Sequence, residues 1–173
     1  MPRAEPDPLE RWTADRDLRA LAAADPSTVT KAVTALAAEA EAAHPAIDED
    51  HLLSVANALR NAGHGTLDGV LTRRLSERPD AARLDVTATL LRTLWRGGGP
   101  DPQAVEALRA ARAAAPSDES ADAAALLALA TALEAGLPEP LREAVRGDLA
   151  AAARQPRRHP AVGPVIERAL RGG

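Results

Sequence analysis

The stretch that decides the fold reads GGGPDPQAVEALRAARAAAP and spans residues 97–116. It opens with three glycines and closes with a proline, and its apolar residues recur at the three- and four-residue spacing of an amphipathic helix. Asp101 is suited to be the N-cap of this helix, and Pro102 suits the first helical position because its missing amide proton is not needed there. The stretch therefore predicts one helix, over residues 102–115, between two stop signals.

Glycine and proline alternate along the rest of the chain with nearly the same period. The glycines, at intervals of 34, 39 and 36 residues, are Gly63, Gly97, Gly136 and Gly172. The prolines, at intervals of 34, 37 and 40 residues, are Pro45, Pro79, Pro116 and Pro156. Each glycine stands where a helix can end in the left-handed conformation, and each proline falls just after a predicted helix end. This interleaved pattern indicates an internal repeat of helix pairs.

Between these stops the apolar residues follow helical spacing, and the β-branched and aromatic residues that strands prefer are scarce. We therefore expect an all-α fold of about nine antiparallel helices, arranged as a right-handed α-solenoid of four helix pairs plus a C-terminal lone helix. Asp48 is the expected N-cap of the third helix, and Ser27 or Thr28 that of the second. The expected helices span residues 9–24, 27–43, 49–62, 67–78, 81–96, 102–115, 121–135, 140–154 and 162–171.

The composition bears on domain organisation and location. Residues 1–8 are expected to form a disordered N-terminal tail, and residues 9–173 a single helical-repeat domain. The absence of cysteine excludes disulfides and fits a reducing cytoplasm. We find no signal peptide and no apolar run near the ~20 residues of a membrane span, so we expect no membrane partner. The richness in alanine, glycine, proline and arginine is typical of a GC-rich bacterial genome, such as that of an actinobacterium.

Charge is distributed unevenly along the chain. The net charge of −4 disfavours nonspecific nucleic-acid binding. Residues 1–60 hold eleven acids and six bases, whereas residues 141–173 hold seven arginines and three acids. This asymmetry suits head-to-tail association of copies or an acidic partner. A basic loop formed by Arg154, Arg157 and Arg158 is suited to contact phosphate or an acidic partner, and a solvated loop is the alternative.

The repeat resembles the tetratricopeptide repeat, in which antiparallel helix pairs stack about every 34 residues, with a glycine between the two helices and a proline after the second. Ala104, Leu108, Ala111 and Pro116 fall at the small, large, small and proline positions of that family. The large aromatic positions of the family are nearly all leucine, valine or alanine here, and the period widens towards that of HEAT-type repeats. A HEAT-like solenoid and a compact helical bundle therefore remain alternatives.

The resemblance implies a concave groove, lined by the first helix of each pair, that binds an extended or helical peptide. Asparagine and arginine there can hydrogen-bond a peptide backbone or a carboxylate, and Trp95 is suited to be an anchor. The alternative is that Trp95 and the leucines are ordinary core residues. The positions carried over to the groove are Leu53, Asn57, Arg60, Asn61, Leu91, Trp95, Leu126, Ala130 and Glu134.

Two short motifs place a carboxylate three residues before a histidine, as di-iron helical bundles do: Glu41 with His44, and Asp48 with His51. Such a site also needs inward-facing glutamates from two further helices, and the apolar stripes supply none. His64 lies in a turn between two glycines without a marked triad partner, which is typical of a solvated loop residue. We therefore expect no metal, no cofactor and no catalytic residue.

The expected function is that of a noncatalytic scaffold or adaptor that binds another protein or a peptide and regulates a larger system. The alternatives are a self-associating structural subunit, a metal-dependent helical-bundle enzyme, and conjugation through the terminal glycine. The last arises because LRGG, residues 170–173, looks like the tail of ubiquitin. Gly172 continues the glycine series, however, and RGG also occurs inside the chain at residues 96–98, so this ending favours a helix stop.

Overall fold

Nine helices make up the part of the chain that the computed structural model describes, which is residues 18–64, 67–96, 98–115, 118–155 and 162–172. No strand occurs in these residues, so the all-α prediction is confirmed. The helices are α2 (Leu18–Ala23), α3 (Pro26–Ala43), α4 (Glu49–Asn61), α5 (Asp68–Glu77), α6 (Ala81–Leu94), α7 (Pro102–Ala114), α8 (Glu119–Ala135), α9 (Leu141–Ala153) and α10 (Val162–Gly172).

The helix limits predicted from the sequence agree with the structure to within two residues wherever the end is described. The start of the first expected helix lies outside the described residues. Asp48 and Asp101 cap α4 and α7 as predicted, each accepting a hydrogen bond from a backbone amide of the first turn. Pro45 and Pro79 lie two residues beyond the ends of α3 and α5, so these two stop signals are confirmed.

The N-cap of α3 differs from the prediction. The cap is Asp25, whose Oδ1 accepts a hydrogen bond from the Thr28 amide at 2.8 Å. Pro26 takes the first helical position, so Ser27 and Thr28, the predicted caps, lie inside the first turn. The physical reason is the proline, whose fixed φ favours the start of a helix and whose missing amide proton leaves no unpaired donor there.

Two of the predicted glycine stops have the left-handed backbone that favours glycine. Gly63 follows α4 with a φ of 89°, and Gly136 caps α8 with a φ of 105°. Gly172 corrects the prediction, because it is the last residue of α10 and its φ does not lie in the left-handed region. The remaining stops lie outside the described residues: Gly97, Pro116 and Pro156.

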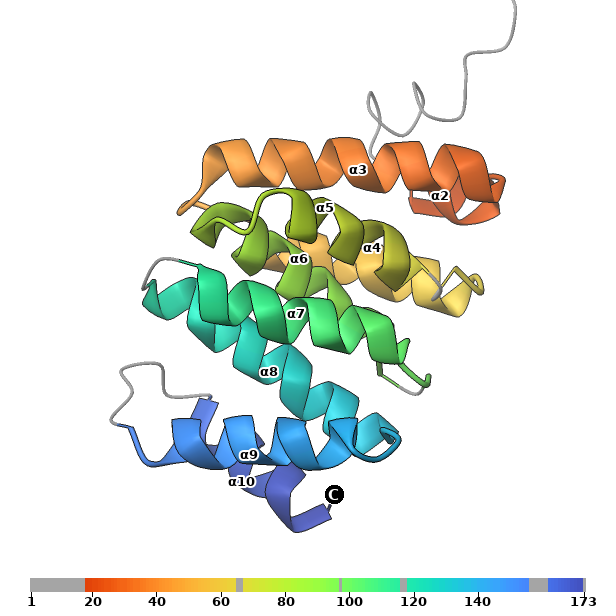
Figure 1. The fold of residues 1–173 in the computed structure, drawn as a ribbon. Helices are drawn as coiled ribbons and strands as arrows, with labels where there is room; N and C mark the ends of the chain where they lie inside the picture. The colour runs from red at the N-terminus through yellow and green to blue at the C-terminus, as the bar shows by residue number, and fades with distance from the viewer. Residues whose placement is uncertain (1–17, 65–66, 97, 116–117, 156–161, 173) are drawn as a thin grey trace, which may run out of the picture.

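The even-numbered helices form a continuous row, called the central row below. In it α2 contacts α4, α4 contacts α6, α6 contacts α8, and α8 contacts α10. The odd-numbered helices, called the outer helices, lie along one side of this row: α3, α5 and α7 contact α6, while α7 and α9 contact α8 (Figure 1). The helices follow one another through the molecule, from α2 and α3 at one end to α9 and α10 at the other.

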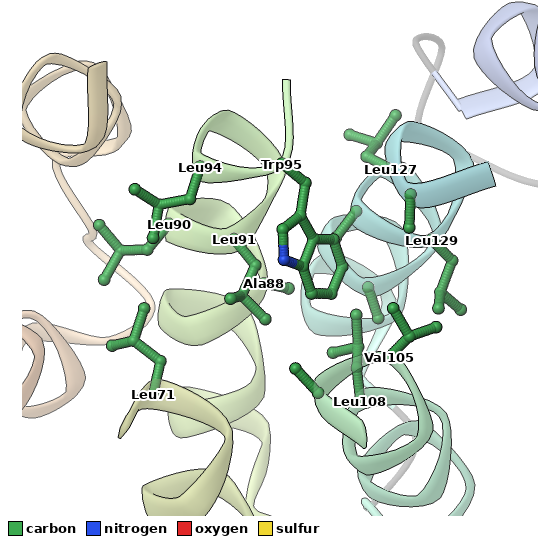
Figure 2. Close-up of a cluster of buried hydrophobic side chains, with 14 of the residues drawn as sticks. Leu71, Ala88, Leu90, Leu91, Leu94, Trp95, Val105, Leu108, Leu127 and Leu129 are labelled. Atoms are coloured by element: carbon green, nitrogen blue, oxygen red, sulfur yellow. The ribbon is translucent and has the colours of Figure 1, made fainter. Parts of the chain in front are cut away.

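The central helices α6 and α8 are buried almost all round. Every residue of α6 from Leu84 to Leu94 is buried except Arg92. The alanine-rich sequence of α8 explains its close packing, because small side chains let neighbouring helices approach, while each buried leucine contributes about 2 kcal/mol of hydrophobic stabilisation. Figure 2 shows the indole ring of Trp95 extending from the end of α6 into this core, near Val105 and Leu108 of α7.

Arginine–carboxylate pairs hold the outer helices in place. Glu41 on α3 is buried and accepts hydrogen bonds from Arg74 of α5 at 2.9 and 3.1 Å and from Arg83 of α6 at 3.4 Å. Because a buried carboxylate needs a partner, this cluster ties three helices together. Two further pairs join α7 to its neighbours, namely Arg109 with Asp148 of α9 at 2.6 Å and Arg112 with Asp122 of α8 at 2.7 Å.

The backbone of Gly136 gives a direct test of the helix stop after α8. We expect Gly136→Ala to lower the free energy of unfolding by about 1–2 kcal/mol, because an alanine is strained at positive φ. A Cβ at Gly136 would meet no atom within 4 Å, so backbone strain alone would be measured by urea unfolding.

Gly147 is the matched control, because it lies inside α9 and a Cβ there would also meet no atom within 4 Å. We expect Gly147→Ala to raise the free energy of unfolding by about 0.5–1 kcal/mol, since alanine is the better helix former. Equal effects of the two substitutions would contradict the assigned backbone at Gly136.

Candidate functional site

A buried carboxylate, that of Asp68, joins the ends of three helices. Asp68 is 6% exposed and begins α5. Its Oδ2 accepts hydrogen bonds from the indole N–H of Trp95 at 3.1 Å and from the Asp101 amide at 3.0 Å, and its Oδ1 accepts from the Gly69 amide at 2.9 Å. Trp95 caps the end of α6, and Asp101 caps the start of α7. This cluster, called the Asp68 node below, therefore fixes the start of α5, the end of α6 and the start of α7 relative to one another.

A cleft of about 690 Å³ opens beside the Asp68 node. The end of α4 contributes Arg60 and Asn61 to its wall, and the segment after α6 contributes Arg96, Gly98 and Gly99. A Cβ on either of these glycines would point into open space, so backbone groups form that part of the wall. The cleft thus combines a charged guanidinium, a side-chain amide and bare backbone.

Arg60 is held across this cleft by two hydrogen bonds. Its Nη1 donates to the Arg96 carbonyl at 3.1 Å, and its Nη2 donates to Asn57 Oδ1 at 2.9 Å. Both acceptors lie at the C-terminal ends of central-row helices, where a cation is favourable to the helix dipole. A guanidinium has five N–H donors, so Arg60 is positioned by the fold with donors left for a ligand.

A second cleft, of about 420 Å³, adjoins the first. The two share Trp95, Arg96 and both glycines, and the second adds Thr131, Glu134 and Ala135 from the end of α8. Glu134 accepts a hydrogen bond from Arg168 of α10 at 3.0 Å. Arg96 therefore lies between two hollows that together run along the ends of α4, α6 and α8.

A narrow crevice of about 40 Å³ lies further along α6, between α4 and α8. Its walls include Glu49, Asp85, Ser120 and Arg92. Asp85 accepts a hydrogen bond from Ser120 Oγ at 3.1 Å, and the His44 Nε2 lies 3.5 Å from the same carboxylate oxygen. Burial raises the pKa of Asp85 above its usual value, although the Ser120 hydrogen bond and His44 oppose this.

Arg92 is the cation of this crevice. Burial lowers the pKa of Arg92, and the like charge of Arg96 lowers it further, while Glu49 opposes these effects. Acids thus lie at one end of the α6 surface and arginines at the other. Sequence reasoning missed Arg92, Arg96, Asp85 and Asp68 as candidates. The available signal was the pair of arginines in RTLWR, four residues apart beside the glycine stop.

The structure brings together some of the residues predicted to bind a peptide. Arg60, Asn61 and Trp95 line the first cleft, and Trp95 and Glu134 line the second. Asn57 is exposed and bonded to Arg60, whereas Leu53 is half-buried on α4, away from the residues that line the clefts.

Four of the predicted groove residues need correction. Leu91, Leu126 and Ala130 have no exposed surface, and Trp95 is 1% exposed, so these are core residues as in the alternative interpretation. The reason is that α6 and α8 have helices on several sides, which leaves their apolar positions no open face. Trp95 contributes to the cleft wall but does not offer its ring as an anchor.

The other sequence candidates have separate positions. Arg154 is exposed at the end of α9, and Arg157 and Arg158 lie outside the described residues. Glu41 binds Arg74 and Arg83 instead of pairing with His44 as a metal motif would require. Among the described residues no group of three or more acidic or histidine side chains is placed to hold a metal ion.

The expectation for His64 is corrected. It is half-buried, and its Nε2 lies 3.2 Å from the Ala22 carbonyl oxygen at the end of α2. The side chain therefore helps to hold α2 against the turn after α4 instead of being a solvated loop residue. The sequence could not reveal this, because the two residues are 42 positions apart.

Comparison with known proteins gives no family: no protein-family model, no curated protein and no solved structure matches the chain. In the part of the chain that the structure describes, no helix is both long enough and apolar enough to cross a membrane.

The Asp68 node gives a stability prediction. We expect Asp68→Ala to lower the free energy of unfolding by about 2–4 kcal/mol, because the buried indole N–H of Trp95 and the partly buried amide of Asp101 lose their acceptor. Asp50→Ala is the control, since Asp50 is exposed in the first turn of α4 and should cost less than about 1 kcal/mol. Urea unfolding measures the free energy of unfolding of both variants. A similarly small loss of stability in the two variants would contradict the structural role of the Asp68 node.

The buried Asp85 gives a pH prediction. Its folded-state pKa is raised above 3.8, so its contribution to stability is present below that pH and is lost as the pH rises through the folded-state value. We expect the stability of Asp85→Asn relative to the unmodified chain to increase between about pH 4 and pH 7. Thermal or urea unfolding at a series of pH values measures this difference.

Asp80→Asn is the control, because the pKa of Asp80 is shifted in the opposite direction to that of Asp85. Burial raises the pKa of Asp80, but hydrogen bonds from the Arg83 amide and the Arg78 side chain outweigh it, and the net pKa is lowered. Its charged form therefore stabilises the fold above the usual pKa, and this stability is lost as the pH falls. Asp80→Asn should be the less stable protein near neutral pH, and a common slope for both variants would contradict the assignment.

Proposed function

We propose that this chain is a noncatalytic helical-repeat scaffold that binds a peptide segment of another protein. The row of α4, α6 and α8, each in contact with the next, supports a right-handed α-solenoid similar to tetratricopeptide repeats, with these helices as the first members of successive pairs. On this proposal α10 is the lone helix that covers the end of the row, since it contacts both α8 and α9.

One observation carries the proposal. Three polar residues predicted from the sequence to contact a peptide line two adjoining clefts at the ends of α4, α6 and α8, although they come from segments up to 74 residues apart: Arg60, Asn61 and Glu134. Convergence of polar side chains from several helices on one hollow surface is typical of a binding site.

The chemistry of the two clefts suits a peptide. Asn61 offers both an amide donor and an acceptor, as the backbone of an extended peptide requires. Arg60 offers a fixed guanidinium, which suits a carbonyl or a carboxylate. The glycine-rich segment at Gly98 and Gly99 lets a second backbone approach closely, because no side chain stands in the way.

Selection from a random displayed peptide library against the immobilised full chain tests this function. We expect recovered peptides to bind the chain in solution. Arg60→Ala should lower their affinity about tenfold, because a central polar contact is lost. Arg73→Ala is the matched control, because Arg73 is exposed on the outer helix α5. Failure to recover any binding peptide, or equal binding by both variants, would contradict a peptide site in these clefts.

A further inference from the structure

Most of the partly buried arginines in the described part of the chain have a carboxylate partner. Arg74 and Arg83, each with a side chain 14% exposed, share Glu41. Arg109 and Arg112, 25% and 23% exposed, pair with Asp148 and Asp122. These pairs connect outer helices to one another or to the central row, so four partly buried guanidiniums of the described residues are matched by an internal acid.

Arg92 and Arg96 depart from this pattern. Neither forms an ion pair or a side-chain hydrogen bond with the residues that the structure describes. Arg92 is the one residue between Leu84 and Leu94 that α6 does not bury, and it lines the crevice, while Arg96 is exposed and lines both clefts. The two cations are four residues apart and act on one another as like charges.

This arrangement is unfavourable without an anion. Burial lowers the pKa of Arg92, and the charge of Glu49 in the same crevice opposes this lowering without forming an ion pair with Arg92. The C-terminal dipole of α6 offsets part of this for a cation in the last turn. It does not explain why a second arginine follows one turn later, since like charges at that spacing repel.

We infer that Arg92 and Arg96 bind acidic side chains of the partner peptide, so that the partner supplies the two carboxylates that the fold omits here. The inference rests on the proposed function and specifies the chemistry of the partner. The peptide would lie over the crevice and the clefts, with neighbouring aspartates or glutamates over the end of α6. Bidentate guanidinium–carboxylate pairing would then give both affinity and register.

The charges along the same surface favour an acidic peptide over a nucleic acid. Glu49 and Asp85 line the crevice together with Arg92, and Asp118 acts on Asp85 as a further nearby acid. A uniform polyanion running along α6 would meet these acids as soon as it left the arginines. A peptide can instead place acids over Arg92 and Arg96 and a neutral or basic residue over Glu49.

Peptides recovered from the displayed library on the full chain provide the probe. We expect them to share at least two neighbouring acidic residues and to bind Arg92→Gln/Arg96→Gln at least about tenfold more weakly than the unmodified chain. The matched control is Arg73→Gln/Arg142→Gln, which removes the same charge from exposed positions on the outer helices α5 and α9 and should bind normally.

A reciprocal change checks that the contact is direct. Replacing the acids of a recovered peptide by glutamine or asparagine should cause the same loss, and that loss should not add to the loss caused by Arg92→Gln/Arg96→Gln. Additive losses would mean that the acids and the arginines act independently, and would overturn the inference.

The remaining outcomes are also decisive. Peptides that lack acids, or that bind Arg92→Gln/Arg96→Gln normally, would overturn this inference and leave the peptide-binding function in place. Failure to recover any peptide would overturn both. Tighter binding of single-stranded oligodeoxythymidine than of any peptide, abolished by the same double substitution, would show a phosphate ligand instead and overturn the acidic peptide.

The melting temperature separates binding from folding. Because neither arginine forms an ion pair with another described residue, we expect Arg92→Gln/Arg96→Gln to melt at or above the temperature of the unmodified chain. A fall of more than about 5 °C, comparable with the loss of a structural interaction, would show that these cations serve the fold and would overturn the inference.

Discussion

A single buried carboxylate holds together the three helix ends beside which the two clefts open. Asp68 begins α5, and its oxygens hold the indole of the residue that caps α6 and the amide of the residue that caps α7. A buried charge is stable only when hydrogen bonds replace its water, so the three helix ends cannot move apart without exposing or orphaning it. The glycine-rich segment between α6 and α7 is thereby held at both ends, and the clefts take their shape from it.

The packing of the central row explains why the two clefts open at the helix ends. The central helices α6 and α8 have other helices around most of their circumference, and alanine and leucine fill that space. Their middles offer little surface to a partner, whereas the helix ends, with arginines and bare glycines, do. The charged pairs of the outer helices are satisfied internally, as Glu41 with Arg74 and Arg83 illustrates. Arg92 and Arg96, which form no ion pair with other described residues, belong to the central row and line the crevice and the clefts.

The helix limits could be predicted because they depend on neighbouring residues in the sequence. The residues of the candidate site were harder to predict, because they depend on contacts between distant parts of the chain. Helical periodicity, together with glycine, proline and aspartate at the helix ends, predicted nearly every described helix limit. The N-cap of α3 was predicted wrongly, because Pro26 takes the first helical position and makes Asp25 the cap. Arg60 and Asn61, which the sequence predicted for a peptide groove, line the first cleft, and their role in binding stays a prediction. It could not decide whether Trp95 and Leu126 were groove or core, because that depends on how many helices surround α6 and α8. Nor could it pair Asp68 with Asp101, 33 residues away.

The Asp68 node shapes the clefts, and our proposal is that the arginines beside it bind an acidic peptide. The most direct measurement is solvent exchange of the Trp95 indole proton by NMR in the Trp12→Phe variant, which leaves one tryptophan signal. Trp95 is 1% exposed and its indole N–H is bonded to Asp68. We therefore expect this proton to exchange with solvent no faster than global unfolding of the protein allows. Exchange at the rate of a free indole would contradict the node, and with it the arrangement of the clefts.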